Sequence, residues 1–184
     1  EGVLIDNFLI VEKGTFREQE TKKLLLSGKY PSRNVEINIS DLKAQIASCE
    51  KGSIELQKLI QEYGLNVVFA YMKHIRKNAE ESIRKVIKKI EQSYSSYLLD
   101  DGTKINIKIT PDKIFRNVTI DFSGTSKPHP RNFNTPTSVA KAAVLYVFRT
   151  LVADEIPINS GCLNPIEIII PENCLLKPKY PSAV

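Results

Sequence analysis

The sequence predicts an α+β fold, in which a long antiparallel helical hairpin is followed by a small mixed or antiparallel sheet with a packed helix. Two observations predict it. Apolar residues recur at helical spacing over residues 40–92. Past residue 100 the period changes to two, which is typical of strands. Hydrophobic residues make up 42% of the 184 residues and charged residues 26%, which indicates a globular chain rather than a disordered one.

The chain divides into three predicted parts. Residues 1–39 hold a strand-like "VLIDNFLIV" and a short helix through "REQETKKLLLS", and residues 40–92 form the helical hairpin. Residues 100–184 form a β-hairpin, a helix and a final strand that share a core. Because the chain starts without Met and ends straight after a strand-like segment, we expect a fragment of a larger subunit.

The hairpin consists of two amphipathic stretches joined at Gly64. Ser40 or Asp41 can cap the first helix, because a short side-chain oxygen accepts from the first-turn amides, and Gly64 supplies its stop. Since the connection is only one or two residues long, we expect the helices to be adjacent and antiparallel. The second helix carries this apolar stripe: Val68, Met72, Ile75, Ala79, Ile83, Val86 and Ile90.

The C-terminal part begins with two alternating stretches, "TKINIKIT" and "FRNVTIDF", with a hairpin connection at Pro111-Asp112-Lys113. A helix should then open at Thr135-Pro136, with Thr135 as the N-cap and Pro136 at the first helical position. "NPIEIIIP" predicts a final buried strand. The expected inner face of the helix is Val139, Ala143, Tyr146, Val147 and Thr150 or Leu151.

Charge and cysteine content narrow the class of protein. The net charge is +5, but the basic residues of the second helix alternate with glutamates at i,i+4 spacing, which favours a solvated helix face. Nucleic-acid binding is therefore the weaker alternative. No apolar run approaches the roughly 20 residues that span a bilayer, so no membrane partner is expected. Three cysteines without framework spacing predict free thiols and a cytoplasmic protein.

The candidate site is the stretch "VTIDFSGTSKPHPRNFNTPTSVAKAAVLY". We assign catalytic roles to Asp121, at the end of a strand, and Arg131, whose guanidinium can clamp an anion or a carbonyl oxygen near a helix N-terminus. Asn132, Asn134 and Thr135 are predicted substrate contacts. The loop lacks the lysine of a phosphate-binding GxxxxGK[ST] motif, so a purely structural strand-to-helix connection is the alternative.

A second polar stretch, "INSGCLNP", adds Asn159 and Cys162 as predicted substrate contacts that could reach the same region. Cys162 has no nearby histidine, so a structural free thiol is the alternative there. His74 and His129 have no carboxylate or thiol at ligand spacing, and the sequence therefore predicts no metal site in this segment.

Five segments in this order resemble the hydantoinase B/oxoprolinase family: "SDLKAQIASCEKG", "YGLNVVFAYM", "IDFSGTS", "NFNTPTSVAKAAVLYVFRTLV" and "IPINSGCLNPIEIIIPENCLLKPKYPSAV". The family includes N-methylhydantoinase B subunits, the C-terminal half of 5-oxoprolinase, and related subunits of acetone and acetophenone carboxylases. The chain departs from the family's Pro-x-Gly turn at Pro171-Glu172-Asn173, where Asn can keep the turn because it tolerates positive φ.

The resemblance implies an internal segment of a B-type subunit in an ATP-dependent hydrolase of cyclic amides. It places ATP, with Mg²⁺, on an actin-like A-type partner subunit and a metal-binding motif outside this chain, so the segment alone should bind neither and be inactive. The substrate is then a small molecule: a hydantoin, 5-oxoproline or, in the carboxylases, a ketone. A purely structural or assembly segment of a related carboxylase subunit is the alternative, and self-association is a further partner option.

Overall fold

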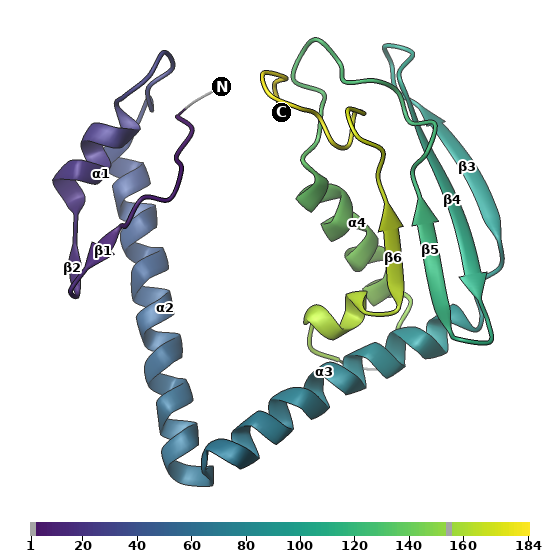
Figure 1. Ribbon diagram of the computed structural model, residues 1–184, viewed down its shortest axis with the longest axis horizontal. Coiled ribbons are helices and arrows are strands. Elements are labelled where there is room, and N and C mark those ends of the chain that lie inside the picture. The colour runs from purple at the N-terminus through teal and green to yellow at the C-terminus, as the bar shows by residue number, and fades with distance from the viewer. Residues whose placement is uncertain (1–2, 154–155) are drawn as a thin grey trace. The chain divides into compact units, whose positions relative to one another are not determined.

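The structure is a computed structural model that describes residues 3–153 and 156–184. It divides into two units, one ending at Val68 and the other beginning at Phe69. The described elements of the first unit are β1 (Val11–Glu12), β2 (Thr15–Phe16), α1 (Glu18–Leu25) and α2 (Val35–Tyr63). Those that follow are α3 (Leu65–Ile87), β3 (Ser93–Leu98), β4 (Lys104–Asp112), β5 (Asn117–Asp121), α4 (Thr137–Thr150), the 3₁₀ helix η1 (Ser160–Leu163) and β6 (Ile166–Ile169) (Figure 1).

Helices dominate the first part of the chain and the main sheet lies in the second, so the predicted α+β class is confirmed. Within the described residues, no helix combines the length and apolarity needed to cross a membrane.

The N-terminal hairpin is shorter than predicted. Of the stretch "VLIDNFLIV" only its last residue enters a strand, and β1 pairs with β2 through Val11↔Phe16 and Glu12↔Thr15. The predicted strand was therefore wrong over most of its length. The short helix that was expected after it is present as α1.

Helix α2 begins at Val35 rather than at Ser40 or Asp41. The Asn34 Oδ1 accepts from the Ile37 N–H at 3.3 Å and caps the helix, while the Ser40 hydroxyl donates to the Glu36 carbonyl inside it. The predicted start was wrong because Asn34 caps one turn earlier, ahead of β-branched residues that a helix tolerates. Consequently α2 crosses the boundary predicted between residues 39 and 40.

Gly64 ends α2 as predicted. Its φ of +83° is a conformation that glycine adopts at little cost, and its N–H donates to the Ile60 carbonyl at 2.9 Å. Helix α3 starts at the next residue, and the boundary between the two units falls inside α3. The antiparallel packing of α2 on α3 stays a prediction.

The sheet of the second unit is mixed, with the strand order β3-β4-β5-β6. β3, β4 and β5 form an antiparallel meander, whereas β5 and β6 are parallel, with Val118 opposite Ile166 and Asp121 opposite Ile169. Helix α4 lies between β5 and β6 in the chain, so these three elements make a βαβ crossover (Figure 1).

Two parts of the meander differ from the prediction. β3 was missed, because "SYSSYL" has no β-branched residue to mark a strand. The hairpin connection lies after Asp112 instead of at Pro111-Asp112-Lys113, since Pro111 is paired with Val118 in the sheet. The Asp112 Oδ1 accepts from the N–H groups of Ile114 and Phe115, both at 2.9 Å, and thereby builds the turn.

The core of the second unit is formed by α3, α4 and one face of the sheet. The buried face of α4 consists of Ala140, Val144 and Phe148, so the predicted face around Val139, Tyr146 and Val147 was wrong. Because α4 is apolar on nearly every side, its sequence period cannot choose between the two stripes. The buried residues contributed by α3 and β5 include Ala79, Ile83, Ile87, Val118 and Ile120.

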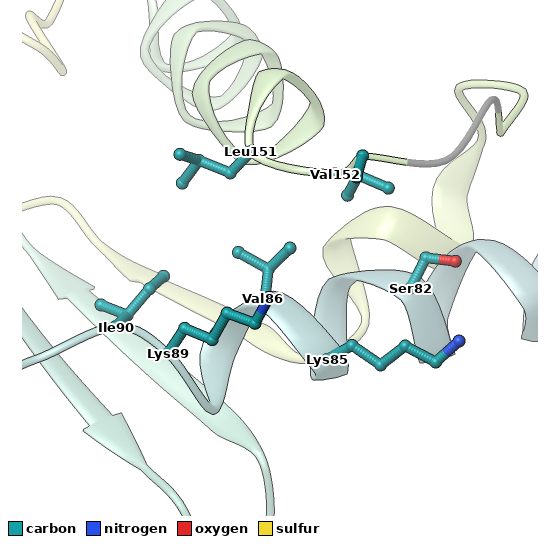
Figure 2. A pocket seen from close by; sticks show the side chains of 8 residues that line it. Ser82, Lys85, Val86, Lys89, Ile90, Leu151 and Val152 are labelled. Carbon is teal, nitrogen blue, oxygen red and sulfur yellow. The ribbon is translucent and has the colours of Figure 1, made fainter.

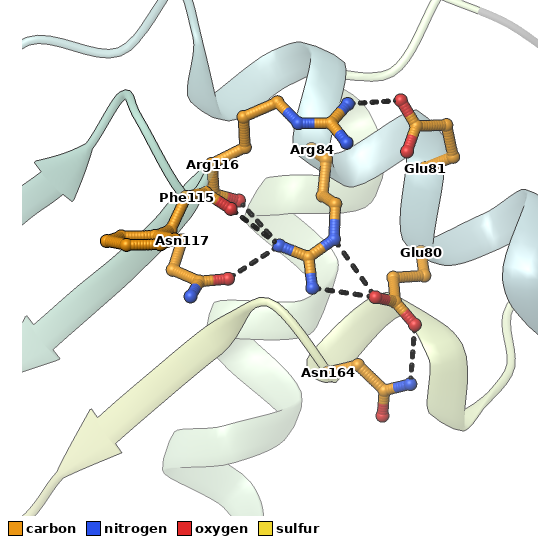
Figure 3. A network of polar contacts seen from close by, with 7 residues as sticks. All are labelled: Glu80, Glu81, Arg84, Phe115, Arg116, Asn117 and Asn164. Carbon is orange, nitrogen blue, oxygen red and sulfur yellow. Dashed lines mark hydrogen bonds and ion pairs between the residues drawn. The ribbon is translucent and has the colours of Figure 1, made fainter.

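A polar network ties α3 to the sheet (Figure 3). The Arg84 guanidinium donates to Glu80 Oε1 at 2.9 and 2.7 Å and to Asn117 Oδ1 at 2.6 Å. Asn164, in the turn before β6, donates to Glu80 Oε2 at 2.8 Å, and Arg116 pairs with Glu81. The network therefore joins the β4–β5 turn and the start of β6 to one helix.

This network should make the unfolding free energy depend on acid. Hydrogen bonds from Asn164 and then Arg84 hold the pKa of Glu80 below its ordinary value of 4.5. A lowered folded-state pKa contributes stability that is present above 4.5 and is lost as the pH falls through the folded value. Urea titrations at about pH 7 and about pH 3 measure how much unfolding free energy is lost on acidification. This loss should be smaller for Glu80→Gln than for the wild type. Parallel losses would contradict this role of Glu80.

Candidate functional site

The candidate site lies where the βαβ crossover places a loop between a strand and a helix. Asp121 ends β5, and residues 122–136 then lead to the N-terminus of α4 (Figure 1). The carboxyl end of a parallel strand that precedes a crossover helix is where α/β sheets bind ligands. The topology therefore puts the predicted loop in a favourable position.

Asp121 is half-buried and is fixed by its own turn. Its Oδ1 accepts from the Ser123 N–H at 2.8 Å. Hydrogen bonds from the Ser123 side chain and backbone, with a weaker contribution from Lys108, keep the pKa of Asp121 below its ordinary value. Asp121 therefore stays ionised at neutral pH, which suits it to orienting a cation or a donor and not to accepting a proton.

The "DFSGTS" stretch does not have the geometry of a phosphate loop. The N–H groups of Thr125 and Ser126 donate to the carbonyls of Phe122 at 3.1 Å and Lys104 at 3.0 Å, and Asn106 Nδ2 donates to the Gly124 carbonyl at 2.9 Å. A phosphate loop leaves several successive amides free for the anion. Here these amides already have protein acceptors, so the stretch does not fit the triphosphate of ATP.

Arg131 and Asn132 are exposed on the same loop. No hydrogen bond or ion pair joins the Arg131 side chain to Asp121 or to any other residue in the part of the chain that the structure describes. The Arg131 guanidinium is therefore accessible, and its role in binding an anion stays a prediction. Its backbone N–H donates to His129 Nδ1 at 3.0 Å, which fixes the position of the residue in the loop.

Asn134 is the centre of the loop rather than an exposed substrate contact. Its side chain is 5% exposed, accepts from the His129 N–H at 2.7 Å, and donates to the carbonyls of His129, Arg131 and Ala183. Its side-chain amide thus both accepts and donates hydrogen bonds inside the protein. It holds the loop that presents Arg131 and joins that loop to the C-terminal segment.

His129 has a partner that sequence reasoning missed. Its Nε2 lies 2.9 Å from Asp101 Oδ2, and its ring meets Phe133 edge-on at 5.2 Å. Because Nδ1 accepts from Arg131, the Nε2 carries the proton that Asp101 accepts. No sequence signal could have found this pair, since Asp101 lies in the turn before β4, and both β4 and β5 separate it from His129 in the sequence.

Thr135 does not cap α4, so that prediction was wrong. The N-cap is Pro136, α4 begins at Thr137, and the Thr135 N–H donates to the Leu175 carbonyl at 2.8 Å. Thr135 lies one residue before the N-cap, so its hydroxyl is not at the position from which a side chain accepts from the first-turn amides.

Asn159 and Cys162 lie at the opposite end of the sheet from Asp121. The Val118 N–H donates to the Pro165 carbonyl at 2.9 Å, which fixes the segment before β6 beside the start of β5, whereas Asp121 is at its end. The Asn159 Oδ1 accepts from the Gly161 N–H at 2.8 Å, and Cys162 is fully buried in the core. The structure thus does not bring these two residues to the predicted site.

A separate crevice of about 300 Å³ lies at the far end of α4 (Figure 2). Val86 and Ile90 face Leu151 and Val152 across it, and Lys85 and Lys89 border it. It is at the C-terminal end of the helix whose N-terminus adjoins Arg131. Among the described residues, no three His, Cys, Asp or Glu side chains come together as metal ligands.

The sequence profile of the Hydantoinase B/oxoprolinase family matches residues 1–184. The chain belongs to this family. It is 42% identical over 193 residues to the 5-oxoprolinase of Dictyostelium discoideum and 39% identical over 208 residues to 5-oxoprolinase 1 of Arabidopsis thaliana. Both matches cover 100% of this chain but only 15% and 16% of those proteins.

A solved structure has the same fold. The ATP-dependent caprolactamase from Pseudomonas jessenii matches with a TM-score of 0.74 at 20% sequence identity, covering 98% of this chain and 32% of that one. The chain therefore spans a small part of the proteins that it resembles.

The turn after β6 keeps the backbone conformation that the family's glycine would allow. Asn173 adopts a positive φ of 52°, as was predicted for an asparagine in place of that glycine.

Proposed function

We propose that this chain is a segment of the B-type region of an ATP-dependent hydrolase that opens cyclic amides, with 5-oxoproline or a related lactam as substrate. The observation that carries the proposal is the 42% identity to a 5-oxoprolinase over the whole chain. Ring opening breaks the amide C–N bond and adds water across it, giving a carboxylate and an amine. ATP and Mg²⁺ are assigned to an A-type region or partner subunit, since the Asp121–Ser126 turn does not fit a triphosphate.

Within that enzyme, Arg131 is proposed to bind an anionic or carbonyl oxygen of the substrate. Its guanidinium is exposed, and its backbone is fixed by His129 and Asn134. A guanidinium can form two parallel hydrogen bonds to a carboxylate, which orients as well as binds. Asn132 is exposed beside it and is proposed as a second contact, while Asp121 would orient a donor group.

Arg131→Ala in the full-length enzyme should lower kcat/KM at least tenfold, equivalent to about 1.4 kcal/mol of lost transition-state stabilisation. The melting temperature should hardly change, because the exposed guanidinium makes no hydrogen bond or ion pair within the described residues. Lys141→Ala, which removes an exposed cation of α4, is the matched control and should leave both quantities unchanged. Wild-type kinetics in the Arg131 variant would remove this loop from the substrate site.

The second candidate function is a purely structural or assembly role for the segment. It is favoured by the hydrogen bonds that Asn134, His129 and the turn amides form within the protein. The polar side chains that the loop exposes are Ser123, Lys127, Arg131 and Asn132. The kinetics of the Arg131 variant decide between the two candidates. Under this second candidate function, the segment could also contribute to self-association of the protein.

A further inference from the structure

One face of the second unit carries an apolar groove of about 320 Å³ between β4 and α4. Ile105, Ile107 and Ile109 form one wall, and all three are only half-buried. Val139 and Val147, each 53% exposed, form part of the other wall. Thr135 is the one polar residue among the described lining side chains.

The groove exists because α4 covers only half of the sheet face. A helix is about 10 Å wide and strands are about 4.8 Å apart, so one helix covers roughly two strands. Helix α4 buries its Ala140–Val144–Phe148 stripe with Ile120 of β5, which leaves the isoleucines of β4 beside it. Its second stripe, Val139–Ala143–Val147, has the four-residue spacing at which a helix packs against a neighbouring helix.

The second stripe explains why α4 is apolar on both sides. A helix with one helix-facing and one sheet-facing stripe is expected in the interior of a layer, not at its edge. Contiguous apolar surface of this kind marks a contact site in soluble proteins. The groove therefore has the shape and chemistry for one further apolar helix alongside α4.

The end of the chain lies at the mouth of this groove. Leu176 lines the groove, and the Ala183 carbonyl accepts from Asn134, the residue next to the groove residue Thr135. In a longer polypeptide, residues after position 184 would start beside the groove, and the entropy cost of closing such a short connection is small. In the 5-oxoprolinase relatives the matched region is only 15–16% of the protein, so most of each polypeptide lies outside it.

We propose that, in the full-length polypeptide, an apolar helix from the sequence following Val184 packs in the groove beside α4. It completes the helical layer over β3 and β4. This assignment concerns the assembly of the polypeptide and is independent of the proposed substrate.

Photo-crosslinking in the full-length protein tests the proposal. A benzoylphenylalanine at position 147 should crosslink to a peptide that follows residue 184, identified by mass spectrometry, and the yield should not change on tenfold dilution. The same probe at Ile114, which is 86% exposed on the β4–β5 turn, should give at least tenfold less of that product.

Cysteine labelling gives a second readout that does not need the bulky probe. In the full-length protein Val147→Cys should react with a maleimide at least tenfold more slowly than Ile114→Cys, and urea should equalise the two rates. Fast labelling at position 147 would overturn the proposal. Protection that disappears on dilution, or a crosslink to a second copy or to a peptide elsewhere in the sequence, would overturn it as well.

Discussion

Gly161→Ala should destabilise the second unit by about 3 kcal/mol, at the upper end of overpacking costs, and lower its melting temperature on the order of 10 °C. A Cβ at this position would lie 2.1 Å from the Arg76 carbonyl oxygen and 2.9 Å from Asn159 Oδ1. The first of these atoms belongs to the backbone of α3 and cannot move without distorting the helix. The missing side chain of Gly161 is what lets η1 approach α3 so closely.

The matched control is Gly52→Ala. Gly52 lies within α2 with nothing near the position of an added Cβ, so alanine should stabilise this helix by about 1 kcal/mol. Scanning calorimetry of both variants measures the two opposite shifts. A Gly161→Ala variant as stable as the wild type would mean that η1 does not approach the α3 backbone as described.

Asn134→Ala should cost about 3 kcal/mol, because it leaves several backbone groups in the loop without their partners. The side chain is buried and bonds to His129, Arg131 and Ala183. Asn134→Asp keeps the shape but turns a donor that serves three carbonyls into a charged acceptor, so it should be at least as harmful near neutral pH. Urea unfolding of both variants measures the loss.

Two controls make this prediction specific. Asn132→Ala alters an exposed neighbour and should change the unfolding free energy by less than about 0.5 kcal/mol. Hydrogen exchange should rise in the C-terminal residues near Ala183 in the Asn134 variants and not in the Asn132 variant. Equal behaviour of the two asparagines would show that Asn134 does not hold the loop.

Local signals predicted much of the fold. Gly64 as a stop, the alternating isoleucines of β4 and the asparagine turn at Asn173 depend on near neighbours, and the structure has all three. The start of α2 and the missing β3 show the limit of such signals. Asn34 caps ahead of a strand-like "VEINIS", and β3 is a strand because it pairs with β4, not because of its residue types.

The site was less predictable than the fold. The position of Arg131 in an exposed loop could be foreseen, because the loop is polar and precedes a helix. The burial of Asn134 and the pairing of His129 with Asp101 depend on residues distant in the chain. Asn159 and Cys162 fell outside the site because β6 runs parallel to β5, and no local pattern specifies that direction.

The hydrogen bond between Asn164 and Glu80 also bears on the order of folding. It joins residues 84 positions apart, whereas β3, β4 and β5 pair with their immediate neighbours along the chain. Closing a long loop costs entropy before its contacts repay it, so the meander should form first and the β6 end should dock on α3 last. Contacts that form after the transition state of folding mainly affect the unfolding rate. The strain in Gly161→Ala should consequently appear as faster unfolding with an almost unchanged refolding rate, and stopped-flow kinetics over a urea series would separate the two.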